Sequence, residues 1–210
     1  MTFTSATFLA FCAVFFPLYY LTIARLRLNN LVVATASILF YGWYQPWFVG
    51  VMLVSSITDF SLGLLIAATG QKNKRRLLLV FSIILNVGFL SYFKYTNFIV
   101  GSLNALVGAL HGGTFDFFLN VVLPAGISFY TFQSMSYTID VYRGHLKPTR
   151  SFVSFLCFVS FFPHLVAGPI MRSTVLLPQV LQRRRFVGSV VYLCRRYYNQ
   201  IYMILSFVGC

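Results

Sequence analysis

The chain has 210 residues, of which 59% are hydrophobic and only 9% charged, and its mean hydropathy is +0.80. A soluble domain is about a quarter charged, so this composition excludes a soluble globular protein and indicates one that crosses a membrane several times. The basic residues, which give a net charge of +13, form short clusters between apolar runs, as in cytoplasmic membrane loops, and this pattern excludes nucleic acid as a partner.

Four apolar stretches in the first half of the chain are each long enough for a transmembrane helix, which needs about 20 residues, with a range of about 17 to 25. They cover residues 2–24, 28–44, 48–69 and 77–93. Trp and Tyr residues around Pro46 predict a turn at the membrane border, because these side chains prefer the headgroup level. The first stretch has no basic residue ahead of it, so we expect a retained helix and not a signal peptide.

Basic residues divide unevenly between the two ends of these predicted helices. Arg25, Arg27 and the basic run 72–76 lie at one end, whereas Lys94 alone marks the other. Cytoplasmic loops carry the excess of Lys and Arg. We therefore expect the N-terminus and the aromatic turn to lie outside the cytoplasm.

The chain is predicted to be less regular after Lys94. Residues 98–110 are apolar but too short to span alone, they are interrupted by glycines, and His111 is expected in a loop. Apolar character returns over residues 119–137, and the basic loop 143–150 follows. This pattern predicts one further helix that ends on the cytoplasmic side.

The apolar run 152–170 has basic residues on both flanks, at Arg150 and Arg172. If both flanks are cytoplasmic, the run enters and leaves the membrane on the same side. Pro163 and the Gly168-Pro169 pair supply residues at which the chain can turn. The sequence therefore predicts a re-entrant hairpin. Irregular backbone at membrane depth must be satisfied by protein or by water, so the hairpin also indicates an internal cavity.

Few ionisable side chains lie within the apolar stretches. Asp59 has no basic residue within a helical turn, so we expect its partner on another helix. Asp140 and Arg143 are three residues apart, which predicts a pair on one helix face at the membrane border. His164 lies at the predicted turn and is open to two interpretations, a structural hydrogen bond or a role in a substrate tunnel.

The residues by themselves show no complete catalytic or metal-binding constellation. The three Asp residues are scattered, and the sequence contains neither a glycine-rich phosphate loop nor a G-x-S-x-G motif. The four cysteines lack ligand spacing, so no metal site is predicted. What remains is a cavity-forming membrane fold without an assigned reaction.

Three sequence phrases resemble the membrane-bound O-acyltransferase family, and within it the alginate O-acetyltransferase branch. They are LPAGISFYTFQ, SYTIDVYRG and FFPHLVAGPIMR, at residues 123–133, 136–144 and 161–172. FYGWYQPWF at 40–48 and GFLSYFKYTNF at 88–98 are also similar to that branch. The resemblance implies an all-α, polytopic protein of a bacterial inner membrane.

The resemblance also implies a reaction. An acetyl group would pass from a cytoplasmic donor, acetyl-CoA or an acyl carrier, through a membrane tunnel to a polysaccharide such as alginate, with the help of periplasmic partner proteins. On the matching stretches, Tyr130, Gln133, His164 and Arg172 fall where the family lines its tunnel, with helix packing as the alternative role. The histidine on which the family's reaction relies lies in a W-R-R-W-H pattern that does not occur here, so no catalytic residue is carried over.

The resemblance identifies residues 1–188 as the N-terminal part of an O-acyltransferase domain. Residues 189–210 depart from the family pattern and place Arg195 and Arg196 inside an apolar run, at a cost of about 2.5–3.5 kcal/mol each. This tail indicates a frameshift, a fusion or a truncated gene model. We therefore expect a fragment that is inactive alone. Whether the chain itself is an enzyme stays open. The alternatives are a membrane scaffold or transporter-like subunit, and a fragment that quality control removes.

Overall fold

The computed structural model describes residues 6–43, 45–111, 122–124, 126–162 and 171–182, and the side chains of all of these except 108–111. Every regular element in this part of the chain is a helix, which confirms the predicted all-α class. The elements are α1 (Ala6–Thr22), α2 (Leu26–Gly42), α3 (Pro46–Ala68), α4 (Lys72–His111), α5 (Ile127–Arg143), α6 (Phe152–Val159) and α8 (Ser173–Leu181).

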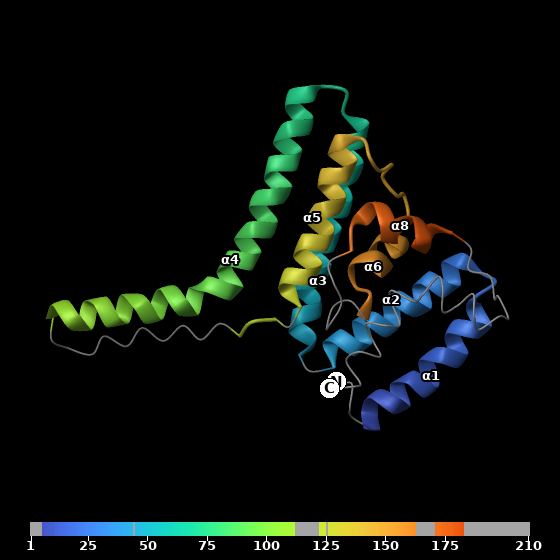
Figure 1. Cartoon of the computed structure of the whole chain (residues 1–210), viewed down its shortest axis with the longest axis horizontal. Coiled ribbons are helices and arrows are strands. Elements are labelled where there is room, and N and C mark those ends of the chain that lie inside the picture. The colour runs from blue at the N-terminus through green and yellow to red at the C-terminus, as the bar shows by residue number, and fades with distance from the viewer. Residues whose placement is uncertain (1–5, 44, 112–121, 125, 163–170, 183–210) are drawn as a thin grey trace.

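Three long helices form one side of the molecule. α3 and α5 lie side by side, and the first half of α4 packs against both (Figure 1). The short helix α6 lies between this layer and α2, while α1 packs against α2, and α8 contacts α5 and α6. The predicted helices 2–24, 28–44 and 48–69 are confirmed as α1, α2 and α3. Within the stretch predicted over 119–137, the described residues 122–124 are not helical, and α5 begins at Ile127 after a left-handed Gly126 with φ 75°.

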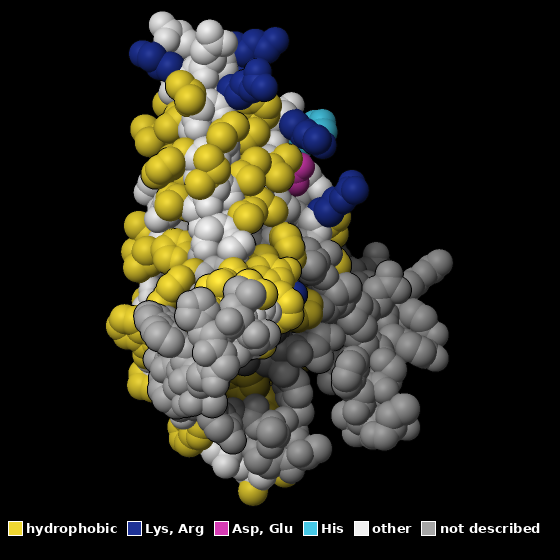
Figure 2. All heavy atoms as spheres, turned by 90° about the vertical axis from the view of Figure 1, so that its left-hand side faces the viewer, with side chains coloured by type: hydrophobic (Ala, Val, Ile, Leu, Met, Phe, Trp, Pro, Cys, Tyr) yellow, Lys and Arg dark blue, Asp and Glu magenta, His cyan; other side chains and the backbone are white. Residues whose placement is uncertain are grey.

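The outer surface of the helices is apolar. Figure 2 shows apolar side chains covering one flank, with Lys and Arg gathered above them at one end. α3 and α4 are long and apolar enough to cross a bilayer, and α1 is a shorter apolar helix. An exposed apolar surface of this extent needs lipid around it, which confirms a membrane protein. The large apolar side chains that are at least half exposed include Leu9, Leu21, Leu39, Leu65, Leu77 and Ile84.

The predicted cytoplasmic loops gather at one end of the molecule, called here the basic end. The Arg75 guanidinium at the start of α4 donates to the carbonyl of Tyr142 in the last turn of α5, at 2.8 Å. At the start of α2, the Asn30 amide donates to Ser154 Oγ of α6 at 3.2 Å and to the carbonyl of Val180 in α8 at 3.0 Å. These bonds place the basic segments on one side, as the charge pattern predicts.

α4 differs from the sequence prediction at both of its ends. The basic residues 72–76, predicted as a loop, form its first turns, and the helix continues through Gly101 to His111, where a loop was expected. A glycine costs about 1 kcal/mol relative to alanine inside a helix, which is too little to end a long helix with otherwise favourable residues. With 40 residues, α4 is about 60 Å long, twice the ~30 Å of bilayer hydrocarbon.

Asp140 and Arg143 lie three residues apart in α5, on one helix face as predicted, but the described residues show no ion pair between them. Asp140 instead accepts a hydrogen bond from the Ser173 hydroxyl, and its carboxylate lies 3.9 Å from Nδ1 of His145. The physical reason is the end of α5. Gly144 adopts φ 77°, so the chain turns back and the backbone N–H of His145 bonds the carbonyl of Asp140 at 3.0 Å. This turn brings His145 to the carboxylate.

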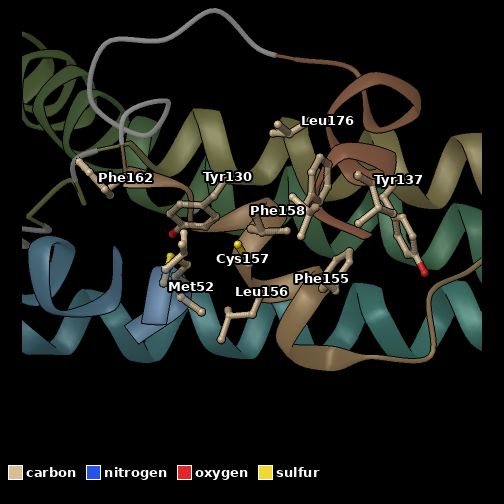
Figure 3. Close-up of a cluster of buried hydrophobic side chains, with 14 of the residues drawn as sticks. Met52, Tyr130, Tyr137, Phe155, Leu156, Cys157, Phe158, Phe162 and Leu176 are labelled. Carbon is tan, nitrogen blue, oxygen red and sulfur yellow. The ribbon is translucent and has the colours of Figure 1, made fainter. Parts of the chain in front are cut away.

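The centre of the core is α6. Phe155, Cys157 and Phe158 are fully buried, and the Phe155 ring lies against Tyr137 of α5 with ring centroids 4.7 Å apart (Figure 3). α6 has only 8 residues, about 12 Å, so it enters the bundle without crossing a bilayer. Its first residue follows directly from the loop at the basic end.

The chain also returns to the basic end after α6. The hydroxyl of Ser173, at the start of α8, donates to Asp140 in the last turn of α5. The segment that enters at residue 152 is therefore back on the same side by residue 173, as the predicted hairpin requires. The predicted turn residues 163–170 lie outside the described part of the chain.

Cysteine labelling tests this same-side arrangement. In a cysteine-free background, we expect a membrane-impermeant maleimide to label Gln179→Cys in α8 only after the cells are permeabilised, whereas Gln45→Cys at the aromatic turn is labelled in intact spheroplasts. Both glutamines are exposed. Gln71→Cys, beside the basic start of α4, serves as the reference for the basic end. Labelling of Gln179→Cys together with Gln45→Cys would contradict the hairpin.

Candidate functional site

A cluster of polar side chains is enclosed between α3, α4 and α5, and is called here the mid-membrane polar cluster. Asp59 lies thirteen residues after the start of α3 and nine before its end. At 1.5 Å per residue these are about 20 Å and 14 Å, so the carboxylate lies near the middle of the bilayer. No member is more than 5% exposed: Ser55, Asp59, Ser82, Asn86, Ser134 and Thr138.

Asp59 is bound by neutral donors from α4. The amide Nδ2 of Asn86 donates to both carboxylate oxygens, at 2.9 and 2.8 Å, and the hydroxyl of Ser82 donates to Oδ1 at 2.7 Å. The prediction that the partner of Asp59 lies on another helix is confirmed. The partner is the side-chain amide of Asn86, which lies one helical turn after Ser82. The sequence signals it only by two polar residues, four positions apart, in an apolar run.

Asn86 also joins α4 to the two neighbouring helices. Its carbonyl Oδ1 accepts hydrogen bonds from Ser55 of α3 at 3.1 Å and from Ser134 of α5 at 3.5 Å. Ser82 lies 3.1 Å from the hydroxyl of Thr138 on α5. Because a buried polar group without a partner costs free energy, this closed network fixes the register of the three helices. Its chemistry is that of a structural clamp, since every member bonds another member.

Gln133 connects α5 to α6. Its amide Nε2 donates to the carbonyl of Phe158 at 2.8 Å, and both groups are buried. Phe158 is in the last turn of α6, where backbone carbonyls have no partner within the helix. Gln133 therefore caps the inner end of α6, and any cavity beyond this end would begin beside Gln133.

Tyr130 lies one turn before Gln133 and points toward α2. Its ring meets that of Tyr41 edge to face, with centroids 6.3 Å apart. The two hydroxyls interact with each other, and neither has another hydrogen-bond partner within the residues that the structure describes. A pair of hydroxyls uses one proton in the bond between them, so the second proton remains available to a polar group from another molecule.

The remaining predicted tunnel residues are placed differently. His164 lies outside the described residues. Arg172 is exposed at the start of α8, next to Ser173, which bonds Asp140. Asp140 is seven residues beyond Gln133 along α5, about 10 Å, so Arg172 belongs to the basic end and not to the Tyr130–Gln133 region.

No group of three His, Cys, Asp or Glu side chains in the described residues could hold a metal ion. Cys12 is a partly buried free thiol, and Cys157 is buried among the apolar residues of α6.

The chain is similar to curated O-acetyltransferases. It is 40% identical over 200 residues to "Probable alginate O-acetylase AlgI" of Azotobacter vinelandii, a match that covers 94% of this chain and 39% of that protein. Its identity to the protein of the same name from Pseudomonas aeruginosa is 39% over 200 residues, covering 94% of this chain and 38% of that protein. "Peptidoglycan O-acetyltransferase" of Helicobacter pylori is 32% identical over 168 residues, which are 69% of this chain and 31% of that protein.

The chain spans about two fifths of the length of the alginate O-acetylases it matches. No family model matches it. No solved structure matches it either.

Proposed function

Because the chain is homologous to an N-terminal portion of the alginate O-acetylases, we propose that it supplies the first helices of a membrane O-acetyltransferase that acetylates an extracellular polysaccharide. The observation that carries this proposal is similarity over 94% of the chain to proteins of that name. In such a transfer, the bond between the acetyl carbon and its donor breaks. An ester bond forms to a polysaccharide hydroxyl oxygen, and the hydroxyl proton passes to the leaving group.

The donor would approach the basic end, which we assign to the cytoplasm. Acetyl-CoA carries phosphate groups, and a phosphorylated acyl carrier is likewise anionic, so both are attracted by a cluster of Lys and Arg. Arg172 is exposed at this end. The acceptor polysaccharide and the periplasmic partner proteins would lie on the opposite side, next to the exposed Trp43 and Trp47.

Tyr130 and Gln133 are the residues that we assign to the wall of the acyl tunnel. They are one turn apart on α5 and buried, and the hydroxyl of Tyr130 interacts only with that of Tyr41 in the described part of the chain. A carbonyl oxygen of a passing acetyl group could accept a hydrogen bond from this hydroxyl. His164 belongs to the same proposal through the family resemblance alone.

We expect these 210 residues alone to transfer no acetyl group, since the W-R-R-W-H pattern that contains the family histidine is absent from them. The host for the test is an alginate-producing bacterium without its own alginate O-acetylase, and the measurement is ester acetyl per uronic acid in the secreted polymer. Acetylated polymer from cells that express only this chain would overturn the expectation of inactivity.

A chimera tests the family role directly. Residues 1–188 replace the matching portion of the Azotobacter vinelandii relative, and acetylation is expected to return in the same host. The intact relative is the positive control. A chimera that reaches the membrane in normal amount but leaves the polymer unacetylated would contradict the proposed function and favour a scaffold role. Acetylated peptidoglycan in place of acetylated alginate would reassign the acceptor.

A further inference from the structure

The second half of α4 cannot lie in the bilayer alongside the other helices. α4 has 40 residues, about 60 Å, while a bilayer has ~30 Å of hydrocarbon. Figure 1 shows that α4 bends near its middle, so that its first half packs beside α3 and α5 and its second half projects away from the bundle. The second half, residues 95–111, is called here the arm.

Cross-helix bonds place the start of the arm at the membrane border. Ser55 of α3 bonds Asn86 of α4, and Asp59 bonds Ser82, so the two helices run antiparallel in a fixed register. Continued to the start of α3, this register puts Lys94 opposite Trp47. Trp47 is 73% exposed and belongs to the aromatic turn at the start of α3. The arm therefore leaves the bundle where Trp and Tyr side chains mark the headgroup level.

Side chains at this level have the character of an interface. Tyr92 and Tyr95, on either side of Lys94, are 54% and 47% exposed. The ammonium group of Lys94 lies 5.7 Å from the centre of the Tyr95 ring. Aromatic rings with polar tips and a flexible cation are the usual residues where a helix meets the headgroups.

The arm itself is amphipathic. Polar or small residues recur at Lys94, Asn97, Gly101 and Asn104, at the three- and four-residue spacing that places them on one helix face. The opposite face carries three large apolar side chains that are each more than half exposed: Ile99, Leu103 and Leu106. The arm from residue 95 to 111 is about 25 Å long, which is long enough to lie along the surface of a bilayer.

We propose that the arm is an interfacial helix that lies on the membrane surface at the end opposite the basic end, with Ile99, Leu103 and Leu106 in the phospholipid layer. Its partner is the bilayer surface that already surrounds the exposed apolar flank of α4, so the contact continues the lipid-facing surface of the bundle. A surface-bound helix of this type inserts its apolar face about 5–10 Å into the boundary between headgroups and acyl chains. The polar face, with Asn97 and Gly101, points to water.

Nitroxide accessibility in vesicles of phosphatidylethanolamine and phosphatidylglycerol tests this placement in the full chain. Spin labels are attached to single cysteines in a cysteine-free background, at Leu103 on the apolar face and at Gly101 on the polar face. Gly101 has open space around it, so that a label fits. Ile84, 62% exposed on the part of α4 beside α3, is the reference for the membrane interior, and Gln71 is the reference for water.

We expect the Leu103 label to collide more often with oxygen than with a water-soluble nickel chelate. Its depth in the bilayer should be about 5–10 Å, which is shallower than that of the Ile84 label. The Gly101 label should show the reverse preference and resemble Gln71. Two outcomes would overturn the proposal. If both arm labels are shielded from oxygen and from nickel, protein covers the arm. If the Gly101 label is as deep as Ile84, the arm crosses the bilayer.

Discussion

Replacing Asn86 with leucine is expected to lower the free energy of unfolding by about 3 kcal/mol, the largest effect that we predict for a single substitution in this chain. The amide of Asn86 supplies a hydrogen bond to each oxygen of the buried Asp59 carboxylate, at 2.9 and 2.8 Å. Leucine removes both bonds and leaves the hydroxyls of Ser82 and Ser134 as the donors beside the carboxylate. Near the middle of the bilayer, no water replaces the lost amide.

The measurement is a reversible unfolding titration in mixed detergent micelles, with controls matched to the network. Thr58→Val changes the residue beside Asp59, but the Thr58 hydroxyl is exposed and bonds only its own helix, so a change within about 0.5 kcal/mol is expected. The double variant Asp59→Leu/Asn86→Leu should be more stable than Asn86→Leu alone, because it removes the carboxylate that has lost its partner. Additive losses in the double variant would disprove the clamp.

Changing Gly63 to alanine is expected to destabilise the packing of α3 on α5 by about 1–3 kcal/mol. A Cβ at position 63 would lie 2.5 Å from Cε1 of Tyr137. The Tyr137 ring is fully buried and held against Phe155, with ring centroids 4.7 Å apart, so it has no free space into which to move. The two helices must therefore separate, or the ring must leave its place in the core.

Gly50→Ala is the matched control for this substitution, because Gly50 lies in the same helix and has no atom within 4 Å of the added Cβ. Alanine is a better helix former, so this variant is expected to keep or raise stability by about 0.5–1 kcal/mol. The two variants are compared by thermal unfolding in the same detergent. Equal stability of Gly63→Ala and Gly50→Ala would show that close approach at Gly63 is unimportant.

The two predictions bear on the proposed tunnel as well as on stability. Tyr130 and Gln133 lie on α5, which the mid-membrane polar cluster holds through Ser134 and Thr138, and which Gly63 lets approach α3. In the acetylation-competent chimera, Asn86→Leu should therefore reduce ester acetyl more than Thr58→Val at equal membrane abundance.

Composition and hydropathy are sufficient to assign the class of this protein and to locate its first helices. The free energy of transferring an apolar stretch into lipid is a sum of contributions from its own residues. Stretches such as 2–24 and 48–69 can therefore be recognised without knowledge of the fold. The same local reasoning located the basic end and required a partner for Asp59 from another helix. It also indicated Tyr130 and Gln133, through their place in a phrase that resembles a known family.

Which side chains meet depends on how the helices pack, and hydropathy does not reveal it. Asn86 was not singled out as a partner of Asp59, because the pairing depends on the antiparallel register of α3 and α4. Asp140 bonds Ser173 and His145 in place of Arg143, because Gly144 reverses the chain at the end of α5. The length of α4 was missed because a glycine penalty of about 1 kcal/mol is small beside the cooperativity of a long helix. Membrane insertion depends on local composition, whereas hydrogen bonds between helices depend on how residues far apart in the sequence are brought into register.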